Sequence, residues 1–271
     1  MDKVWFITGA SKGFGREFAT AALERGDRVA GTARDVTALE DLARRFGRRL
    51  LALPLDIRDR AADFDAVTRA HREFGQLDVI VNNAGYGHFG AFEELTEADL
   101  RDQFETNLFG SVWITQAALP IMRTQGSGHI VQMSSMAGIL AFPNLSAYEG
   151  SKWALEAMSE GLAAEVARFG IRVTIVEPGP FGTDWNDRSA RKSDKMAEYD
   201  PMRSADEEKR EGASWGDPKA AAHALLKLVD AAKPPLRQLF GADTLGYISF
   251  MYEKRLQGWK DGNHLAQLAQ G

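Results

Sequence analysis

Short apolar runs rich in β-branched and aromatic residues alternate along the chain with longer segments in which apolar residues recur every three or four positions. The short runs predict seven strands, at residues 4–8, 28–33, 50–55, 77–81, 129–133, 171–176 and 236–240. Because these runs lack polar alternation, both faces of each strand are expected to be buried, and helical crossovers make neighbouring strands parallel. The pattern predicts a single α/β domain over residues 1–271, in which helices cover both faces of a doubly wound, mostly parallel seven-stranded sheet.

Two segments fit this alternation poorly. Residues 183–216 are charged and rich in small residues, and connections of this length are typically functional or disordered. We predict a substrate lid there; a solvated insertion without ligand contact is the alternative. Residues 243–259 carry an aromatic and aliphatic series with no strand after it. That series is expected to flank a pocket, to pack against another subunit or to cover the core, and the pattern leaves these three open.

Composition narrows the class of protein. The 271 residues are 44% hydrophobic and 26% charged, and no apolar run reaches the roughly 18 residues of a membrane-spanning helix. A formal net charge of −5 without a basic stripe argues against nucleic acid as the partner. The chain has no cysteine, which removes disulfides and thiolate chemistry, and we expect no export signal, because its first residues lack a long apolar segment. We expect a cytoplasmic protein with a small-molecule partner and with neither a membrane nor a nucleic acid as partner.

A glycine-rich turn follows the first predicted strand and opens a helix. It reads Thr8-Gly-Ala-Ser-Lys-Gly-Phe-Gly15. Its glycines, Gly9, Gly13 and Gly15, would permit a tight turn and a close approach of the backbone to a pyrophosphate, whose charge the helix N-terminus would stabilise. Because the turn lies in the first β-α-β unit, it favours a dinucleotide site over a purely structural turn.

Further motifs follow at the ends of the later predicted strands and in two helices. They are Asp56, Asn82-Asn-Ala-Gly85, Asn107, Ser134-Ser135, Tyr148-Glu-Gly-Ser-Lys152, Pro178-Gly179 and Thr183. With Thr-Gly-x-x-x-Gly-x-Gly, this set resembles the short-chain dehydrogenase/reductase family over the first 185 residues, and the resemblance implies a Rossmann-type fold. It also implies the catalytic residues Asn107, Ser135, Tyr148 and Lys152. The cofactor-binding residues are expected to be Gly9, Ser11, Lys12, Gly13, Phe14, Gly15, Arg34, Asp56, Ile57, Asn83, Ala84, Gly85, Tyr148, Lys152, Pro178, Gly179, Phe181 and Thr183.

The resemblance implies individual roles for several of these residues. Asp56 would touch the adenine, and Thr183 would bind the nicotinamide carboxamide. The turn at residues 82–85 would support the sheet near the cofactor. Lys152 would bind the nicotinamide ribose, and Asn107 would position a water that links Lys152 to solvent.

The end of the second predicted strand bears on the choice of dinucleotide. An acidic residue there would bind the ribose 2′-hydroxyl of NAD and repel a 2′-phosphate. This chain has Ala33 at that position, followed by Arg34, and Lys12 lies in the glycine-rich turn. Two cations could flank a phosphate, so we predict a preference for NADP(H) over NAD(H). Asp35, one residue further on, is the feature that speaks against this prediction.

Tyr148, Lys152 and Ser135 have the side chains that a carbonyl reduction needs. Tyr148 and Lys152 are four residues apart and so share one face of a helix. Tyr148 would exchange a proton with the substrate oxygen, and a lysine charge about 4 Å away could lower its pKa of about 10 by as much as ~3. Ser135 would donate a hydrogen bond to the developing oxyanion. The spacing alone is also typical of a surface pair, so the interpretation depends on its position after the fifth strand.

The predicted function is reversible hydride transfer between NADP(H) and a carbonyl compound or secondary alcohol. The candidate substrate pocket consists of Tyr86, His88, Phe89, Phe142, Leu145 and Trp185, which favour an apolar or aromatic ketone. The five histidines lack metal-ligand spacing, so no metal is expected. A dinucleotide sensor without turnover and an epimerase or dehydratase are the alternatives. From the resemblance we also expect a homodimer or homotetramer.

Overall fold

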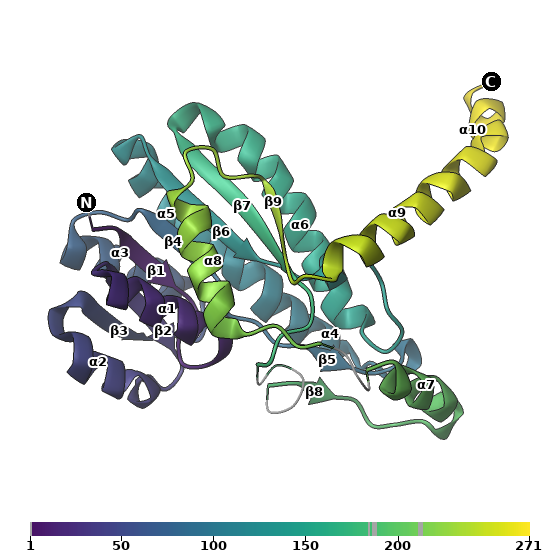
Figure 1. Ribbon diagram of the computed structural model, residues 1–271, viewed down its shortest axis with the longest axis horizontal. Coiled ribbons are helices and arrows are strands. Elements are labelled where there is room, and N and C mark those ends of the chain that lie inside the picture. The colour runs from purple at the N-terminus through teal and green to yellow at the C-terminus, as the bar shows by residue number, and fades with distance from the viewer. Residues whose placement is uncertain (1, 184, 186–188, 211–213) are drawn as a thin grey trace.

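Seven parallel strands form the central sheet of the protein (Figure 1). The computed structural model describes residues 2–183, 185, 189–210 and 214–271. The strand order is β3-β2-β1-β4-β6-β7-β9. Their bounds are Val4–Ile7 (β1), Arg28–Ala33 (β2), Leu50–Pro54 (β3), Val79–Asn82 (β4), Gly128–Met133 (β6), Ile171–Pro178 (β7) and Arg237–Phe240 (β9). All seven predicted strands are present, with ends that differ by one or two residues, and the doubly wound fold is confirmed.

Helices cover both faces of this sheet, as the sequence predicts (Figure 1). One face carries α1 (Gly13–Arg25), α2 (Glu40–Phe46) and α8 (Pro218–Asp230). The other carries α3 (Arg60–Phe74), α5 (Gly110–Gln125) and α6 (Ser146–Val166), with α4 (Glu97–Phe104) packed against α6. Short 3₁₀ turns lie at Val36–Leu39, Gly47–Arg49, Phe92–Glu94, Met136–Gly138, Ala167–Phe169 and Ala197–Tyr199. A π-helical turn at Glu105–Phe109 joins α4 to α5.

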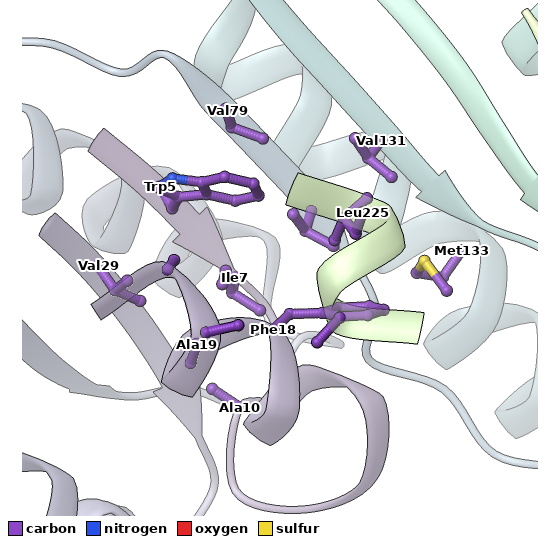
Figure 2. Close-up of a cluster of buried hydrophobic side chains, with 14 of the residues drawn as sticks. Trp5, Ile7, Ala10, Phe18, Ala19, Val29, Val79, Val131, Met133 and Leu225 are labelled. Atoms are coloured by element: carbon purple, nitrogen blue, oxygen red, sulfur yellow. The ribbon is translucent and has the colours of Figure 1, made fainter. Parts of the chain in front are cut away.

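Alternate side chains of each strand enter two separate cores. Trp5 and Ile7 of β1 pack on the α1 and α8 side, and Figure 2 shows them in one cluster with Phe18 of α1 and Leu225 of α8. Phe6 belongs to the core on the opposite face of the sheet. Burying a side chain of this size contributes about 1.5 to 3 kcal/mol, so these two cores fix the strand ends on which the site is built.

The segment after β7 contains regular structure. Residues Arg191–Lys192 (β8) pair in parallel with His88–Phe89 (β5), and α7 spans Asp200–Arg210. The predicted lid at residues 183–216 therefore includes a strand and a helix rather than loop alone, and its role as a lid stays a prediction. Residues 184, 186–188 and 211–213 of this segment lie outside the described residues.

The C-terminal segment forms α9 (Thr244–Asp261) and α10 (Asn263–Gln270), which project away from the body of the molecule (Figure 1). α9 packs through Ile248 and Met251 against the loop that follows β6, and its Arg255 donates a hydrogen bond to the Ile139 carbonyl of that loop at 3.3 Å. The aromatic series predicted to flank the pocket, contact a subunit or cover the core is thus largely exposed in the single chain. In the part of the chain that the structure describes, no helix has both the length and the apolar character to cross a membrane.

Candidate active site

The glycine-rich turn connects β1 to α1 at the carboxyl edge of the sheet. Gly9 and Gly13 have positive φ angles of +66° and +54°, which disfavour other residues. A Cβ built on Gly15 would lie only 2.3 Å from the carbonyl oxygen of Gly9, so the turn is closed by backbone contact. Lys12 precedes α1 without a side-chain cap, and the first turn of α1 has no acidic residue. The helix N-terminus is therefore available to an anion, which fits a dinucleotide pyrophosphate.

The turn at residues 82–85 supports this glycine-rich turn. The Asn83 side-chain amide donates hydrogen bonds to the carbonyls of Thr8 (2.9 Å) and Gly9 (3.2 Å). The Thr8 hydroxyl accepts hydrogen bonds from the backbone N–H groups of Asn83 and Ala84, both at 2.9 Å. Asn82 lies deeper and donates to Thr115 at 2.9 Å. The ends of β1 and β4 are thus tied together where the resemblance implies a bound cofactor.

The residues that follow β2 carry the predicted phosphate selectivity. Within the described part of the chain, Arg34 and Lys12 make neither a hydrogen bond nor an ion pair through their exposed side chains. The Asp35 carboxylate accepts hydrogen bonds from the Thr37 N–H (3.0 Å) and hydroxyl (2.7 Å), which hold the pKa of Asp35 below its usual range. Asp35 therefore caps the following 3₁₀ turn rather than pairing with Arg34.

The remaining expected cofactor contacts lie around the same edge of the sheet. Asp56 forms an ion pair with Arg58 at 2.6 Å. Phe181 packs edge-on against Phe14, with ring centroids 5.0 Å apart. A Cβ built on Gly13 would lie 3.8 Å from Thr183, so the end of β7 faces the glycine-rich turn. The others in this group are Ser11, half-buried in the turn; Ile57, buried after β3; and Pro178 and Gly179, at the end of β7.

Tyr148 and Lys152 project from the first turns of α6 into the protein, and each is 5% exposed. The Lys152 Nζ donates a hydrogen bond to the carbonyl of Met133 (2.7 Å), the last residue of β6. It lies 5.8 Å from the centroid of the Tyr148 ring. Ser135 follows β6, and its hydroxyl hydrogen-bonds with the Tyr148 side chain while accepting the Ala137 N–H at 3.1 Å. The structure therefore brings these three predicted residues together.

The expected lowering of the Tyr148 pKa by Lys152 is wrong for the protein on its own. Burial raises the pKa of Tyr148 to about 12, and the hydrogen bond with Ser135 opposes this only in part. Burial also lowers the pKa of Lys152 to about 8. Two deeply buried groups both favour their neutral forms, and the Lys152 ammonium is directed at a carbonyl of β6 rather than at the phenol oxygen.

Asn107 lies in the π-helical turn between α4 and α5, a feature that is frequent at functional sites. Its side-chain amide donates to the carbonyl of Tyr86 (3.0 Å) and to the Ser151 hydroxyl (3.1 Å), and its Oδ1 accepts the Tyr86 N–H (3.1 Å). A Cβ built on Gly85 would lie 3.0 Å from Asn107 Oδ1 and 3.6 Å from Lys152 Nζ. Asn107 therefore lies with the predicted catalytic group.

Aromatic side chains from the substrate-pocket prediction surround Tyr148. The Trp185 ring lies 4.8 Å from the Tyr148 ring and 5.6 Å from the Phe89 ring, centroid to centroid. Leu145 is buried in the same cluster, and Phe142 packs at its edge. A Cβ built on Gly87 would lie 2.4 Å from the Trp185 ring, so the indole fits only because residue 87 is glycine. That glycine was not among the predicted site residues.

Tyr86 and His88 lie outside this aromatic cluster in the structure. The Tyr86 ring stacks under the guanidinium of Arg191, 4.8 Å away. The buried His88 ring pairs with the Ser193 hydroxyl at 2.9 Å. Along β5, successive side chains point to opposite sides, so Phe89 faces Tyr148 while His88 does not.

Three residues that the sequence reasoning missed lie on α6 beside the predicted catalytic group. Ser151 accepts the hydrogen bond of Asn107. Glu149 accepts the N–H of Phe142 at 2.5 Å, and burial raises its pKa to about 7. Glu156 is a buried carboxylate one turn beyond Lys152. The spacing of Glu156 could have identified it in the sequence. It lies four positions after Lys152, so both side chains are expected on the same face of the helix.

Comparisons with known proteins agree with this geometry. The sequence model of a family described as short chain dehydrogenase matches residues 3–194. The oxidoreductase BOA17 of Botryotinia fuckeliana is 42% identical over 251 residues, covering 91% of this chain and 92% of that protein. The crystal structure of a short-chain dehydrogenase from Streptomyces avermitilis matches with a TM-score of 0.91 at 41% identity, covering 99% of this chain and 98% of that one.

Solved structures of similar proteins contain nicotinamide dinucleotides. An alcohol dehydrogenase from the archaeon Thermococcus sibiricus, complexed with 5-hydroxy-NADP, matches with a TM-score of 0.74 at 26% identity, covering 89% of this chain and 95% of that one. A further structure of the same fold contains NAD. Both a phosphorylated and an unphosphorylated dinucleotide are therefore found in solved structures of this fold.

Proposed function

This chain belongs to the short-chain dehydrogenase family, and from that premise we propose that it interconverts a carbonyl compound and a secondary alcohol with NADP(H). The observation that carries the proposal is the group formed by the buried Tyr148 and Lys152 with the half-buried Ser135 at the end of β6. When bound, the dinucleotide supplies or accepts the hydride.

Tyr148 has the properties of a general acid for carbonyl reduction. With a pKa raised to about 12 by burial, its phenol keeps its proton throughout the physiological pH range. Ser135 hydrogen-bonds with the same phenol, so both hydroxyls can reach one substrate oxygen. Lys152 stands beside the phenol, and its charge would stabilise the phenolate that remains after proton transfer. Asn107, held by Tyr86 and Ser151, fixes the π-helical turn next to Lys152.

The preference for NADP(H) rests on Arg34 and Lys12. Both side chains are exposed and lack ion pairs within the described residues, while Asp35 is engaged as a cap. A 2′-phosphate offers these cations a charge-assisted contact that a 2′-hydroxyl does not. We expect Arg34→Ala to weaken NADPH binding about tenfold and to leave NADH binding within about twofold.

Cofactor titration by fluorescence measures both affinities. Arg44→Ala is the matched control. Arg44 is an exposed arginine on α2 that pairs with Glu40 at 3.5 Å, and it is not among the expected cofactor-binding residues. Wild-type protein that binds NADH as tightly as NADPH, or more tightly, would contradict the preference.

The substrate class that we propose is an apolar or aromatic ketone. Support comes from the apolar walls around Tyr148, which are formed by Trp185, Phe89 and Leu145. NADPH depletion should be followed with aromatic ketones, aliphatic ketones, ketoesters, steroids and sugars. We expect turnover with one of the apolar classes and none with sugars. If the protein binds NADPH but does not oxidise it with any carbonyl of the panel, the result would instead support a dinucleotide sensor.

Location and assembly are also proposals. A chain without cysteine suits a reducing compartment, in keeping with a cytoplasmic enzyme. The exposed apolar side chains of α9 are of the kind that a second subunit covers, in keeping with a homodimer or homotetramer.

A further inference from the structure

Lys152 is a buried cation whose hydrogen-bond partner is uncharged. Its side chain is 5% exposed, and its Nζ donates to the Met133 carbonyl. Among the described residues, no carboxylate forms an ion pair with Lys152. A buried ammonium group without an opposite charge nearby is costly, and it loses its proton readily. A counter-charge is therefore needed if Lys152 is to act as a cation beside Tyr148.

Glu156 meets that need by its position on α6. Tyr148, Lys152 and Glu156 are spaced four residues apart, so they follow one another along the inward face of the helix. Glu156 is only 3% exposed. A Cβ built on Gly138 would lie 2.8 Å from Glu156 Oε1 and 2.4 Å from the Ser134 hydroxyl, so these two atoms share a small space behind the end of β6.

An arginine of β9 holds the Glu156 carboxylate in place. The Arg237 guanidinium of β9 donates hydrogen bonds to the carboxylates of Glu156 and of Glu177 in β7. It also donates a hydrogen bond to Glu160 of α6, at 2.9 Å. The Ser134 hydroxyl, next to Met133, lies near Glu156 Oε1 and opposes the rise of the Glu156 pKa that burial causes. The ion pair with Arg237 thus fixes the Glu156 carboxylate on the inward face of α6.

We propose that Glu156 is a positioning residue for Lys152: its buried carboxylate, fixed by Arg237, supplies the negative charge that keeps the Lys152 ammonium protonated beside Tyr148. The consequence for turnover rests on the proposed function, whereas the effect on the Lys152 proton does not. Glu156 acts through Lys152 and touches neither substrate nor cofactor.

The two groups ionise in the same pH range. Burial raises the pKa of Glu156 to about 7, with Glu177 adding to this effect and Arg237 and Ser134 opposing it. Burial lowers the pKa of Lys152 to about 8, and Glu156 opposes that fall. As the pH rises through 7, Glu156 becomes negative and its charge then retains the proton on Lys152 to higher pH.

The test is an NMR titration of protein that carries ¹³C at the lysine Cε, without cofactor or substrate. The Lys152 signal is assigned by its absence from Lys152→Arg. We expect Glu156→Gln to lower the pKa of Lys152 by about 1. Glu160→Gln is the matched control, because Glu160 also pairs with Arg237 but is half-exposed, and it should leave that pKa within about 0.2 of wild type.

Ser134→Ala provides a second variant that removes only a hydroxyl. Without the hydroxyl beside Glu156, the pKa of Glu156 should rise further, and the pKa of Lys152 should therefore fall by a smaller amount than in Glu156→Gln. An unchanged Lys152 pKa in both Glu156→Gln and Ser134→Ala overturns the proposal. If Glu156→Gln does not fold, the Ser134→Ala result alone decides it.

Activity supplies an independent readout. With a carbonyl substrate, kcat of Glu156→Gln at pH 7 is expected to fall roughly tenfold, with KM for NADPH little changed and with Glu160→Gln close to wild type. A fall in the Lys152 pKa without any carbonyl turnover in wild type would support the role of Glu156 and contradict the proposed function. The two failures are therefore distinguishable.

Discussion

Asp63 of α3 has a fully buried side chain, and neither carboxyl oxygen has a hydrogen-bond partner within the described structure. Burial, together with the nearby charges of Asp59 and Asp56, raises its pKa to about 8. In the unfolded chain an aspartate has a pKa of about 3.9. Because the folded state holds a proton that the unfolded state releases, the stability is full below about pH 4 and decreases as the pH rises towards 8.

This buried carboxyl predicts a pH-dependent loss of stability. Relative to Asp63→Asn, the free energy of unfolding of the wild type should fall by about 2 to 4 kcal/mol between pH 5 and pH 8. Urea denaturation at the two pH values measures this difference. Asp65→Asn, an exposed neighbour on the same helix, should keep the wild-type pH dependence. An Asp63→Asn variant that loses as much stability as wild type would show that Asp63 is not the cause.

At the scale of elements, the pairing of β5 with β8 holds the predicted lid segment against the candidate site. The Gly87 carbonyl accepts the N–H of Arg191, and the Phe89 carbonyl accepts the N–H of Ser193, both at 2.9 Å. The Trp185 indole, six residues before Arg191, rests on Tyr148 and passes over Gly87. These contacts give the segment a defined position beside the predicted catalytic tyrosine.

Gly87→Ala tests the contribution of that aromatic wall. The new methyl group would lie 2.4 Å from the Trp185 ring, so the indole has to move away from Tyr148. Loss of one aromatic contact costs about 1 kcal/mol, and we expect KM for an aromatic ketone to rise about three- to tenfold with unchanged NADPH affinity. Steady-state kinetics measure both. Gly246→Ala on α9, where a Cβ meets no atom within 4 Å, is the control, and an unchanged KM in Gly87→Ala would exclude Trp185 from the substrate wall.

The sequence predicted those elements whose signal is local. Mostly apolar runs identified all seven strands, because strands of a parallel sheet with helices on both faces show no polar alternation. The two-residue strands β5 and β8 have no such signal, since each exists only through pairing with the other across about one hundred residues. The Tyr148 pKa was misjudged for a similar reason, because the burial that raises it is a property of the folded environment.

Over the whole molecule, the body and the C-terminal arm differ in character. The body holds the sheet, the two cores and the candidate site, whereas α9 and α10 extend away from it (Figure 1). Exposed apolar side chains along this arm include Phe250, Leu256, Trp259 and Leu268. An apolar surface of this kind on a monomer indicates an interaction site, so the expected homodimer or homotetramer stays a prediction that sedimentation of the wild type can test.

Tyr148 is the proton donor to the carbonyl substrate in the proposed reaction, and no other residue there has this role. The most direct measurement is NADPH oxidation by Tyr148→Phe with the carbonyl that the wild type reduces, together with NADPH binding by fluorescence. Loss of a general acid should reduce kcat by about 10²- to 10⁴-fold, with NADPH affinity within about twofold of wild type. Tyr252→Phe, an exposed tyrosine on α9, should keep wild-type rates. Turnover by Tyr148→Phe within tenfold of wild type would contradict the account.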